Sequence, residues 1–308
     1  MFLGYTAIRK YFKVEKAMGI SIYCLGKKAF LALENLNTDL VFAIDLIIIG
    51  TDRNIKEDYS LQIKDIAGSK GLRFCYRNEV GDKENKSSYK IAIGWKWLIE
   101  IEPWQQLIVF HDSLLPKYRG FNPLVTALIN GDPTIGATCF FGTKEYDSGE
   151  VILQKSLAIE YPIKIDEAIS KISSLYAEFL EFVIDSIKNE KSINGYEQKE
   201  SEATYSIWRD ENDYLIDWTK SAMYIKRFVD AVGYPYKGAF FYFGDKKIRI
   251  EEVDIADDVI IVNRDAGKVF KSINSNPVVI CGIGLIEIKK MVDENGNNFN
   301  FDLFRVRL

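Results

Sequence analysis

Histidine is almost absent from this 308-residue chain, in which His111 is the only one. Cysteine is sparse as well, and the four cysteines, Cys24, Cys75, Cys139 and Cys281, lie far apart with no CxxC pair. Protein zinc sites are built from clustered Cys and His ligands, so this composition argues against a zinc site, and we predict no bound metal. Four scattered thiols are typical of a reducing compartment, which predicts free, mostly buried cysteines in a cytoplasmic protein.

The chain also lacks strong charge of one sign and long apolar runs. Its formal net charge is -4, which does not favour nonspecific binding to nucleic acid or to anionic membranes. No apolar run reaches the roughly 18 residues that a membrane helix needs. The first 19 residues lack the apolar core of a signal peptide. They fit a short surface helix, or else Met18 is the true start of the protein.

Apolar and charged residues make up 47% and 27% of the chain, as in ordinary globular proteins, and the length predicts about two domains. Short apolar runs alternate with stretches of helical periodicity in the first half. Such alternation predicts a Rossmann-like, doubly wound, mostly parallel sheet covered on both faces. The expected strands are 20–25, 46–50, 72–76, 89–95, 107–110 and 135–142, and the expected helices are 27–36, 60–71, 122–132 and 166–188.

The pattern changes in the second half of the chain. Residues 189–203 are polar and charged, which predicts an interdomain linker between a first domain at 1–188 and a second at 204–308. In the second domain a helical stretch within 215–232 is followed by short apolar runs at close intervals. These runs predict a small antiparallel, OB-like β-barrel. Its expected strands are 238–243, 247–255, 259–262, 267–272, 277–282 and 284–290.

His111 follows the strand expected at 107–110 and opens the loop HDSLLPKYRG. In open α/β sheets ligands bind outside the carboxyl ends of the strands, so this loop is where chemistry is expected. Histidine is also the usual proton handler near neutral pH. Further along, the segment KEYDSGEVI carries Asp147 in a polar turn.

HDSLLPKYRG and KEYDSGEVI together resemble the HxSLLPxxRG and D(S/T)G signatures of the N10-formyltetrahydrofolate-dependent formyltransferases. The segment from IDW to PYKGAFFY resembles the start of that family's C-terminal barrel, so the resemblance covers nearly the whole chain after residue 19. The family includes enzymes that formylate methionyl-tRNA, glycinamide ribonucleotide or nucleotide sugars. The resemblance implies an enzyme that uses N10-formyltetrahydrofolate as its co-substrate.

The resemblance further implies that His111 and Asp147 are the catalytic residues. Formyl transfer to an amine passes through a tetrahedral intermediate, which requires removal of a proton and donors for the developing oxyanion. The family usually has asparagine two residues before the histidine, but Val109 stands there in this chain. Strand alternation places Val109 and His111 on the same side. Loss of one oxyanion donor typically costs on the order of 100- to 1000-fold in rate.

The missing asparagine leaves several alternatives open. Another donor compensates for it, the candidates being Asn122, Thr138, Thr143 and a backbone N–H. Otherwise the enzyme is slow, catalyses a different acyl transfer or hydrolyses formyl-folate. The remaining alternative is a noncatalytic folate- or nucleotide-binding homologue.

The resemblance also assigns binding residues. Flat apolar walls with a few backbone donors and acceptors suit a heteroaromatic ring, and Trp95 and Trp97 either stack on that ring or, as is commoner for such residues, pack in the core. The expected cofactor-binding residues are Ile93, Gly94, Trp95, Trp97, Leu115, Phe141, Gly142, Tyr146 and Asp147. The expected substrate-binding residues are Lys96, Ser113, Lys117, Arg119, Gly120 and Asn122.

We predict the acceptor of the formyl group from the charge and the length of the chain. A tRNA-binding protein is expected to present a basic face, but residues 205–308 contain nearly equal numbers of basic and acidic residues. In the family, glycinamide ribonucleotide enzymes generally lack the C-terminal barrel. We therefore predict N-formylation of a UDP- or dTDP-linked aminosugar in glycan biosynthesis, with methionyl-tRNA as the alternative acceptor. We expect no nucleic-acid or membrane partner, and consider a homodimer as a further option.

Overall fold

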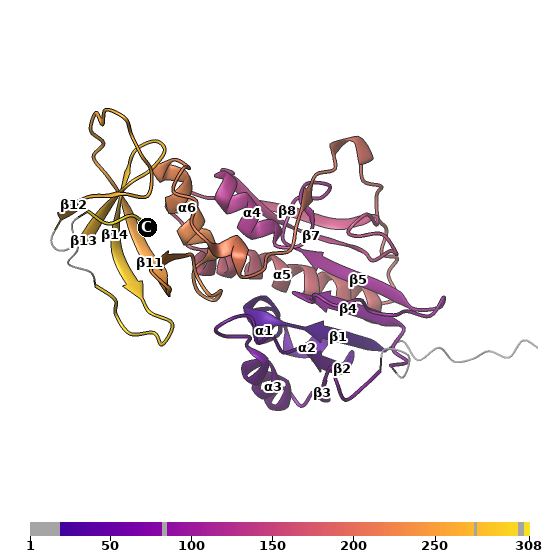
Figure 1. The fold of residues 1–308 in the computed structure, drawn as a ribbon. Coiled ribbons are helices and arrows are strands. Elements are labelled where there is room, and N and C mark those ends of the chain that lie inside the picture. The colour runs from indigo at the N-terminus through magenta and orange to yellow at the C-terminus, as the bar shows by residue number, and fades with distance from the viewer. Residues whose placement is uncertain (1–18, 82–84, 274–275, 301–304) are drawn as a thin grey trace, which may run out of the picture.

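The computed structural model describes residues 19–81, 85–273, 276–300 and 305–308, and two β-sheets organise them (Figure 1). The expectations for the N-terminal segment, a surface helix or a start at Met18, lie outside the described residues. None of the helices in the described ranges is long and apolar enough to span a membrane. All four cysteines are free, and Cys24, Cys139 and Cys281 are buried.

The first sheet has seven strands in the order β3-β2-β1-β4-β5-β7-β8. The first five of these pair in parallel, and β7 and β8 are antiparallel to their neighbours. This arrangement confirms the predicted mostly parallel, Rossmann-like sheet. The bounds are β1 (Ile20–Cys24), β2 (Ile44–Ile49), β3 (Phe74–Tyr76), β4 (Tyr89–Ile93), β5 (Gln106–His111), β7 (Thr134–Phe141) and β8 (Val151–Ala158).

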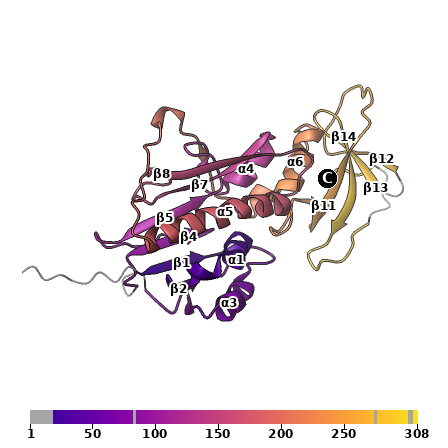
Figure 2. The same cartoon turned by 180° about the vertical axis from the view of Figure 1, so that it is seen from behind.

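One face of this sheet packs against helices. The helices are α1 (Gly26–Glu34), α2 (Thr38–Val41), α3 (Ser60–Ser69), α4 (Pro123–Asn130) and α5 (Ile165–Lys188). The long α5 lies across the sheet in Figure 2. Phe110 of β5 contacts Tyr176 and Phe179 of α5, with ring centroids 5.3 and 5.9 Å apart. The apolar positions of α5 recur at helical spacing and bury this face.

The opposite face of the sheet is buried by strand and loop residues, with no helix residue in its cluster as far as the structure describes it. Tyr23, Ile48, Ala92 and Ile99 form the centre of that cluster. Leu107 and Val109 of β5 pack against it and remain half-buried, as does Trp95. Because side chains alternate along β5, His111 shares this less covered face with Val109.

The C-terminal sheet has five antiparallel strands in the order β10-β11-β14-β13-β12 and curves into a half-barrel. This agrees with the small antiparallel domain that was predicted. Figure 1 places α6 (Ala222–Val232) between this sheet and α4. The strand bounds are β10 (Phe240–Phe243), β11 (Lys246–Ala256), β12 (Val269–Ile273), β13 (Asn276–Ile280) and β14 (Leu285–Val292).

Two strands of four or more residues differ from the predictions. The expected strand at 259–262 is wrong, because this apolar run lies in a loop with no partner strand and the side chain of Ile260 is 98% exposed. Conversely, β8 was not predicted, since its second half is polar and half-exposed and so lacks the apolar run of the buried strands.

The segment at 189–203 connects the two sheets and also contacts the loop that follows His111. It contains a short 3-10 helix, η1 (Glu200–Glu202), and leads into β9 (Tyr205–Ser206). β9 pairs in parallel with β6 (Arg119–Gly120) at the end of the HDSLLPKYRG loop. A second short 3-10 helix, η2 (Asn212–Tyr214), precedes α6. The domain boundaries at 188 and 204 stay a prediction.

Candidate active site

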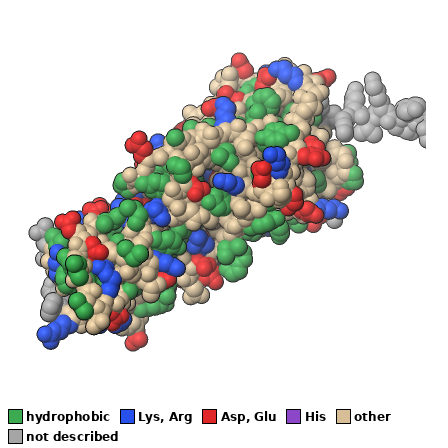
Figure 3. Space-filling view, turned by 90° about the horizontal axis from the view of Figure 1, so that it is seen from above, with side chains coloured by type: hydrophobic (Ala, Val, Ile, Leu, Met, Phe, Trp, Pro, Cys, Tyr) green, Lys and Arg blue, Asp and Glu red, His purple; other side chains and the backbone are tan. Residues whose placement is uncertain are grey.

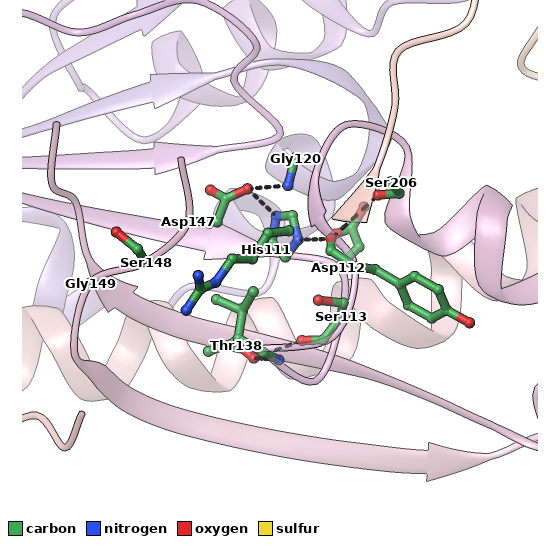
Figure 4. A network of polar contacts seen from close by, with 12 residues as sticks. His111, Asp112, Ser113, Gly120, Thr138, Asp147, Ser148, Gly149 and Ser206 are labelled. Atoms are coloured by element: carbon green, nitrogen blue, oxygen red, sulfur yellow. Dashed lines mark hydrogen bonds and ion pairs between the residues drawn. The ribbon is translucent and has the colours of Figure 1, made fainter. Parts of the chain in front are cut away.

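His111 is the last residue of β5, and its side chain lies at the carboxyl end of the sheet, only 7% exposed. Its Nε2 atom is 2.9 Å from the carbonyl oxygen of Tyr118, and Figure 4 shows the ring beside Asp147 and Gly120. A carbonyl oxygen only accepts hydrogen bonds, so Nε2 carries a proton and donates it. In the neutral ring, Nδ1 is then the free base, and this tautomer is fixed by the loop backbone.

Asp147 lies opposite that free nitrogen. Its Oδ2 atom is 3.6 Å from Nδ1 of His111 and accepts the backbone N–H of Gly120 at 2.7 Å. The N–H donor orients the carboxylate, so that its Oδ2 atom faces the imidazole ring of His111. A proton taken up at Nδ1 is therefore held between two fixed groups, as general acid–base chemistry requires.

The loop between these residues is fastened to β7. Thr138 donates its hydroxyl to the carbonyl of Ser113 at 2.6 Å and accepts bonds from the Leu115 N–H and the Gln154 side chain. The Ser113 hydroxyl donates to the carbonyl of Lys117 at 2.6 Å. Thr138 is fully buried, so its hydroxyl is not available to an oxyanion. Ser113 likewise shapes the loop through a bond within it.

Gly120 permits the close approach of β9. Its φ of 100° lies in the region that favours glycine, and a Cβ atom there would lie 2.5 Å from the carbonyl oxygen of Ser206. On either side of it, Arg119 N–H donates to the Thr204 carbonyl at 2.8 Å and Phe121 N–H donates to the Ser206 carbonyl at 3.0 Å. These contacts set the position of the N–H that Asp147 accepts.

The predicted substrate-binding cations differ in how available they are. Arg119 is 3% exposed, and its guanidinium donates to Gln198 and, at 2.8 Å, to Glu200. Burial works to lower the pKa of Arg119, but the hydrogen bonds and charges of Glu200 and Tyr205 together outweigh burial and raise that pKa. Lys96 pairs with Asp52 at 2.5 Å. Lys117 is exposed and forms no ion pair with another described residue, so it is the cation open to a ligand.

Trp95 and Trp97 form an aromatic wall after β4. Their ring centroids are 4.9 Å apart, and the Trp95 ring is 5.1 Å from that of Tyr23. A Cβ atom on Gly50 would lie 2.7 Å from the Trp97 ring, so glycine at the end of β2 makes room for this wall. Within the described residues, the buried Nε1 of Trp95 has no hydrogen-bond partner.

The other residues predicted to bind folate lie around His111 or beneath it. Ile93 and Leu115 are buried in the protein, Gly94 has a φ of 63°, and the N–H of Gly142 donates to the Leu107 carbonyl. Phe141 is half-buried, whereas Tyr146 is 74% exposed and its ring is 6.3 Å from that of Phe121. Half-buried Leu107 and Val109 belong to the cluster that Trp95 packs against. This set fits a flat heteroaromatic ring, with Trp95 Nε1 as an unused donor.

Sequence reasoning missed the partners of the residue that follows His111. Asp112 contacts the Lys28 ammonium and the Tyr176 hydroxyl on the helix side of the sheet. Burial raises the pKa of Tyr176 well above its ordinary value, and Asp112 raises it further. Lys28 and Tyr176 lie 84 and 64 positions from Asp112 in the sequence, so no local sequence pattern predicts these contacts.

Two cavities frame the sheet. One of about 690 Å³ lies at the amino ends of the strands, lined by residues that include Asp45, Arg73 and Ser87, and is remote from His111. One of about 260 Å³ lies beside the catalytic loop, lined among others by Ser113, Lys117 and Tyr118. Neither His111 nor Asp147 lines either cavity, but the smaller one adjoins the loop that follows His111. Among the described residues, no group of three His, Cys, Asp or Glu side chains is placed to hold a metal ion.

Comparison with known proteins places both halves of the chain. Residues 96–179 match the formyl transferase family, and residues 209–305 match the formyl transferase C-terminal domain. The methionyl-tRNA formyltransferase of Thermodesulfovibrio yellowstonii is 30% identical over 225 residues, covering 69% of this chain and 70% of that protein. The one from Acetivibrio thermocellus is 29% identical over 194 residues, covering 63% of this chain and 61% of that protein. The chain thus spans about three fifths of the length of the first relatives.

Solved structures share the fold over more of the chain. The sugar 3N-formyl transferase WlaRD, determined with dTDP and 5-N-formyl-THF, has a TM-score of 0.63. It is 18% identical, and the match covers 91% of this chain and 98% of that one. At that identity the likeness concerns the fold, including the order of the two sheets.

Proposed function

We propose that this chain, which belongs to the formyltransferase family, transfers a formyl group from N10-formyltetrahydrofolate to an amine. One observation carries this proposal. The only histidine of the chain has one ring nitrogen bound to the Tyr118 carbonyl and the other facing the Asp147 carboxylate, at the carboxyl end of the sheet.

His111 and Asp147 handle the proton of the acceptor amine. N10-formyltetrahydrofolate supplies the formyl carbon that the amine attacks. Nδ1 of His111 takes up the proton that the amine loses, and Asp147 stabilises the resulting imidazolium. The bond between the formyl carbon and N10 then breaks, and the imidazolium returns the proton to N10, so that tetrahydrofolate leaves. Gly120 N–H keeps the carboxylate in place during this change of charge.

Asn122 is the side chain we propose as the oxyanion donor in place of the missing asparagine. Thr138 is committed to other bonds, and the Thr143 hydroxyl donates to the Glu145 carbonyl at 3.0 Å. By contrast, no hydrogen bond to a described residue occupies the Asn122 carboxamide, which is half-exposed two residues after Gly120. A carboxamide N–H at this position would stabilise the charge that develops on the formyl oxygen.

The folate is expected to lie on the less covered face of the sheet. Leu107 and Val109 supply an apolar floor, and Trp95 and Trp97 supply one wall. The turn from Phe141 to Asp147 supplies the other wall. Flat ring systems bind between surfaces of this kind, where a few polar groups fix their orientation.

A UDP- or dTDP-linked aminosugar is the acceptor that we propose. Figure 3 shows Lys and Arg side chains interspersed with Asp and Glu over the face that it draws. Such a balance does not favour the phosphate-rich surface of a tRNA. Lys117 beside the smaller cavity offers one cation to a diphosphate. The shared architecture with WlaRD supports this choice through the fold alone.

Methionyl-tRNA is the second candidate acceptor. It is favoured by the names of relatives in sequence, among them those from Acetivibrio thermocellus and Thermodesulfovibrio yellowstonii, which are methionyl-tRNA formyltransferases. Both candidates use the same donor and the same catalytic pair, so they differ only in what the surface around the site binds.

The decisive experiment offers N10-formyltetrahydrofolate together with a panel of UDP- and dTDP-aminosugars, and separately with methionyl-tRNA. Tetrahydrofolate release and the mass of the formylated product are recorded beside His111→Ala. A formylated sugar that disappears in the variant supports the proposal. If only methionyl-tRNA is formylated, the acceptor is methionyl-tRNA and not a nucleotide sugar. If the protein binds folate but formylates no acceptor, it is a binding protein and not an enzyme.

A further inference from the structure

Gln198 lies in the segment between the two sheets and contacts both motifs of the site. Its Nε2 donates to the carbonyl oxygens of Asp147 at 2.8 Å and Gly149 at 2.7 Å. Its Oε1 accepts two bonds from the Arg119 guanidinium, at 3.1 and 3.0 Å. The carboxamide therefore uses both donors and both acceptor positions, and every bond reaches a residue of, or adjacent to, the catalytic loop and turn.

The conformation of Asp147 explains why such a contact is needed. Its φ of 51° lies in the left-handed region, which costs free energy for any residue with a Cβ atom. Strained backbone of this kind persists only where surrounding contacts determine it. The Gln198 carboxamide holds the carbonyl of that residue, while Gly120 N–H holds its carboxylate.

Arg119 completes the connection. It precedes Gly120, and its guanidinium is fixed by Gln198 and by Glu200. One side chain thus ties the turn that carries Asp147 to the strand that carries the Gly120 N–H. Relative motion of these two pieces would lengthen the 3.6 Å separation between Asp147 and His111.

We propose that Gln198 is a positioning residue for formyl transfer, which holds Asp147 at the distance and orientation that His111 requires. The inference rests on the proposed function for its kinetic part and on the geometry alone for its structural part. Displacement of a catalytic group by about 1 Å costs on the order of 100-fold in rate. A loss of that order in kcat is expected when the carboxamide is removed.

Three variants test the proposal. Gln198→Met keeps the length of the side chain and removes its hydrogen bonds. Gln198→Glu keeps the acceptors for Arg119 but turns an oxygen toward the carbonyls of Asp147 and Gly149. Lys199→Met is the matched control, because Lys199 is an exposed neighbour whose one ion pair within the described residues is with Glu202 at 3.1 Å.

Kinetics distinguish positioning from a general loss of structure. We expect Gln198→Met to lower kcat by roughly 10- to 100-fold with the KM for both substrates nearly unchanged. In the Asp147→Asn background the same change is expected to cost little more, since the group it positions is already removed. Gln198→Glu is expected to be no better than Gln198→Met. Wild-type kcat in Gln198→Glu, or full additivity with Asp147→Asn, would overturn the proposal.

A second measurement does not depend on activity. Because His111 is the only histidine, ¹⁵N-histidine labelling gives one set of ring signals that needs no further assignment. Gln198→Met is expected to move these signals in the direction seen for Asp147→Asn, and Lys199→Met is expected to leave them in place. Unmoved signals in Gln198→Met overturn the proposal. If wild-type protein transfers no formyl group at all, the proposed function fails, and this measurement still decides whether Gln198 positions Asp147.

Discussion

The backbone N–H of Gly120 donates to Oδ2 of Asp147 at 2.7 Å, so one hydrogen bond joins the end of the HDSLLPKYRG loop to the DSG turn. The same oxygen faces Nδ1 of His111 at 3.6 Å. The two segments that suggested chemistry in the sequence therefore meet at a single carboxylate oxygen. This relationship makes the carboxylate the group whose removal is most informative.

Asp147→Asn is expected to lower kcat on the order of 100- to 10,000-fold, the range that general acid–base groups contribute. The amide retains an oxygen for the Gly120 N–H but no longer stabilises a charged imidazole beside it. Steady-state formyl transfer measures the loss, with Glu145→Gln on the same exposed turn as the control. Near-normal turnover in Asp147→Asn would remove the pair from the mechanism.

Asn122→Ala is expected to lower kcat on the order of 100-fold, the usual effect of deleting one oxyanion donor. Val109→Asn in that background is expected to restore much of the rate, since Val109 lies on the face of β5 that carries His111. Thr143→Ala is the control, because that hydroxyl is bound to the Glu145 carbonyl. Turnover that is indifferent to Asn122 assigns the oxyanion to backbone donors instead.

Lys117→Met is expected to raise the KM for a nucleotide sugar about tenfold and leave the KM for folate unchanged, because charge-assisted contacts to phosphate contribute roughly 1.5 to 3 kcal/mol. Lys117→Arg retains the charge and is expected to stay near the wild type. Initial rates over a range of both substrates separate these effects. Equal KM values in Lys117→Met and wild type would place the diphosphate elsewhere.

Gly50→Ala tests the aromatic wall. The added methyl group would lie 2.7 Å from the Trp97 ring and 3.0 Å from the Trp95 ring. Overpacking of this kind typically costs about 1 to 3 kcal/mol and displaces the neighbouring side chains. We expect a lower free energy of unfolding in urea, altered tryptophan fluorescence and weaker folate binding. Gly68→Ala, where the new methyl group meets open space on α3, is the control.

Glu211 gives a pH-dependent prediction for the C-terminal half. Burial works to raise its pKa, but hydrogen bonds from Lys247 and Arg249 outweigh burial and hold the pKa below the ordinary value of 4.5. A carboxylate with a lowered pKa stabilises the folded state above that value, and the contribution is lost as the pH falls through the folded pKa. Glu211→Gln is therefore expected to lower the free energy of unfolding by about 1 kcal/mol at pH 7. The difference from wild type should shrink below pH 4; a constant difference would assign the effect to packing.

The strands of the first sheet were predictable because buried parallel strands consist of continuous apolar residues. The run LIVF placed His111 correctly at the carboxyl end of β5. The same rule failed for VIIV at 259–262, where an apolar run has no strand to pair with, and for the polar second half of β8. The apolar content of a segment indicates burial, whereas a β-strand also requires a neighbouring strand with which it can form hydrogen bonds.

Sequence patterns alone were enough to predict the family resemblance, the sheet with its small antiparallel second domain, and the candidate proton handler. Those features depend on local periodicity and on contiguous motifs. Tertiary structure alone decided that Arg119 is committed to Gln198 and Glu200, that Tyr118 fixes the tautomer of His111, and that the polar segment at 189–203 supports the site. Apart from the contact between Tyr118 and His111, these contacts join residues that are far apart in the chain. The long-range contacts depend on the pairing of β9 with β6. A polar segment looks the same in sequence whether it faces water or another part of the protein, so only the fold reveals which hydrogen bonds it makes.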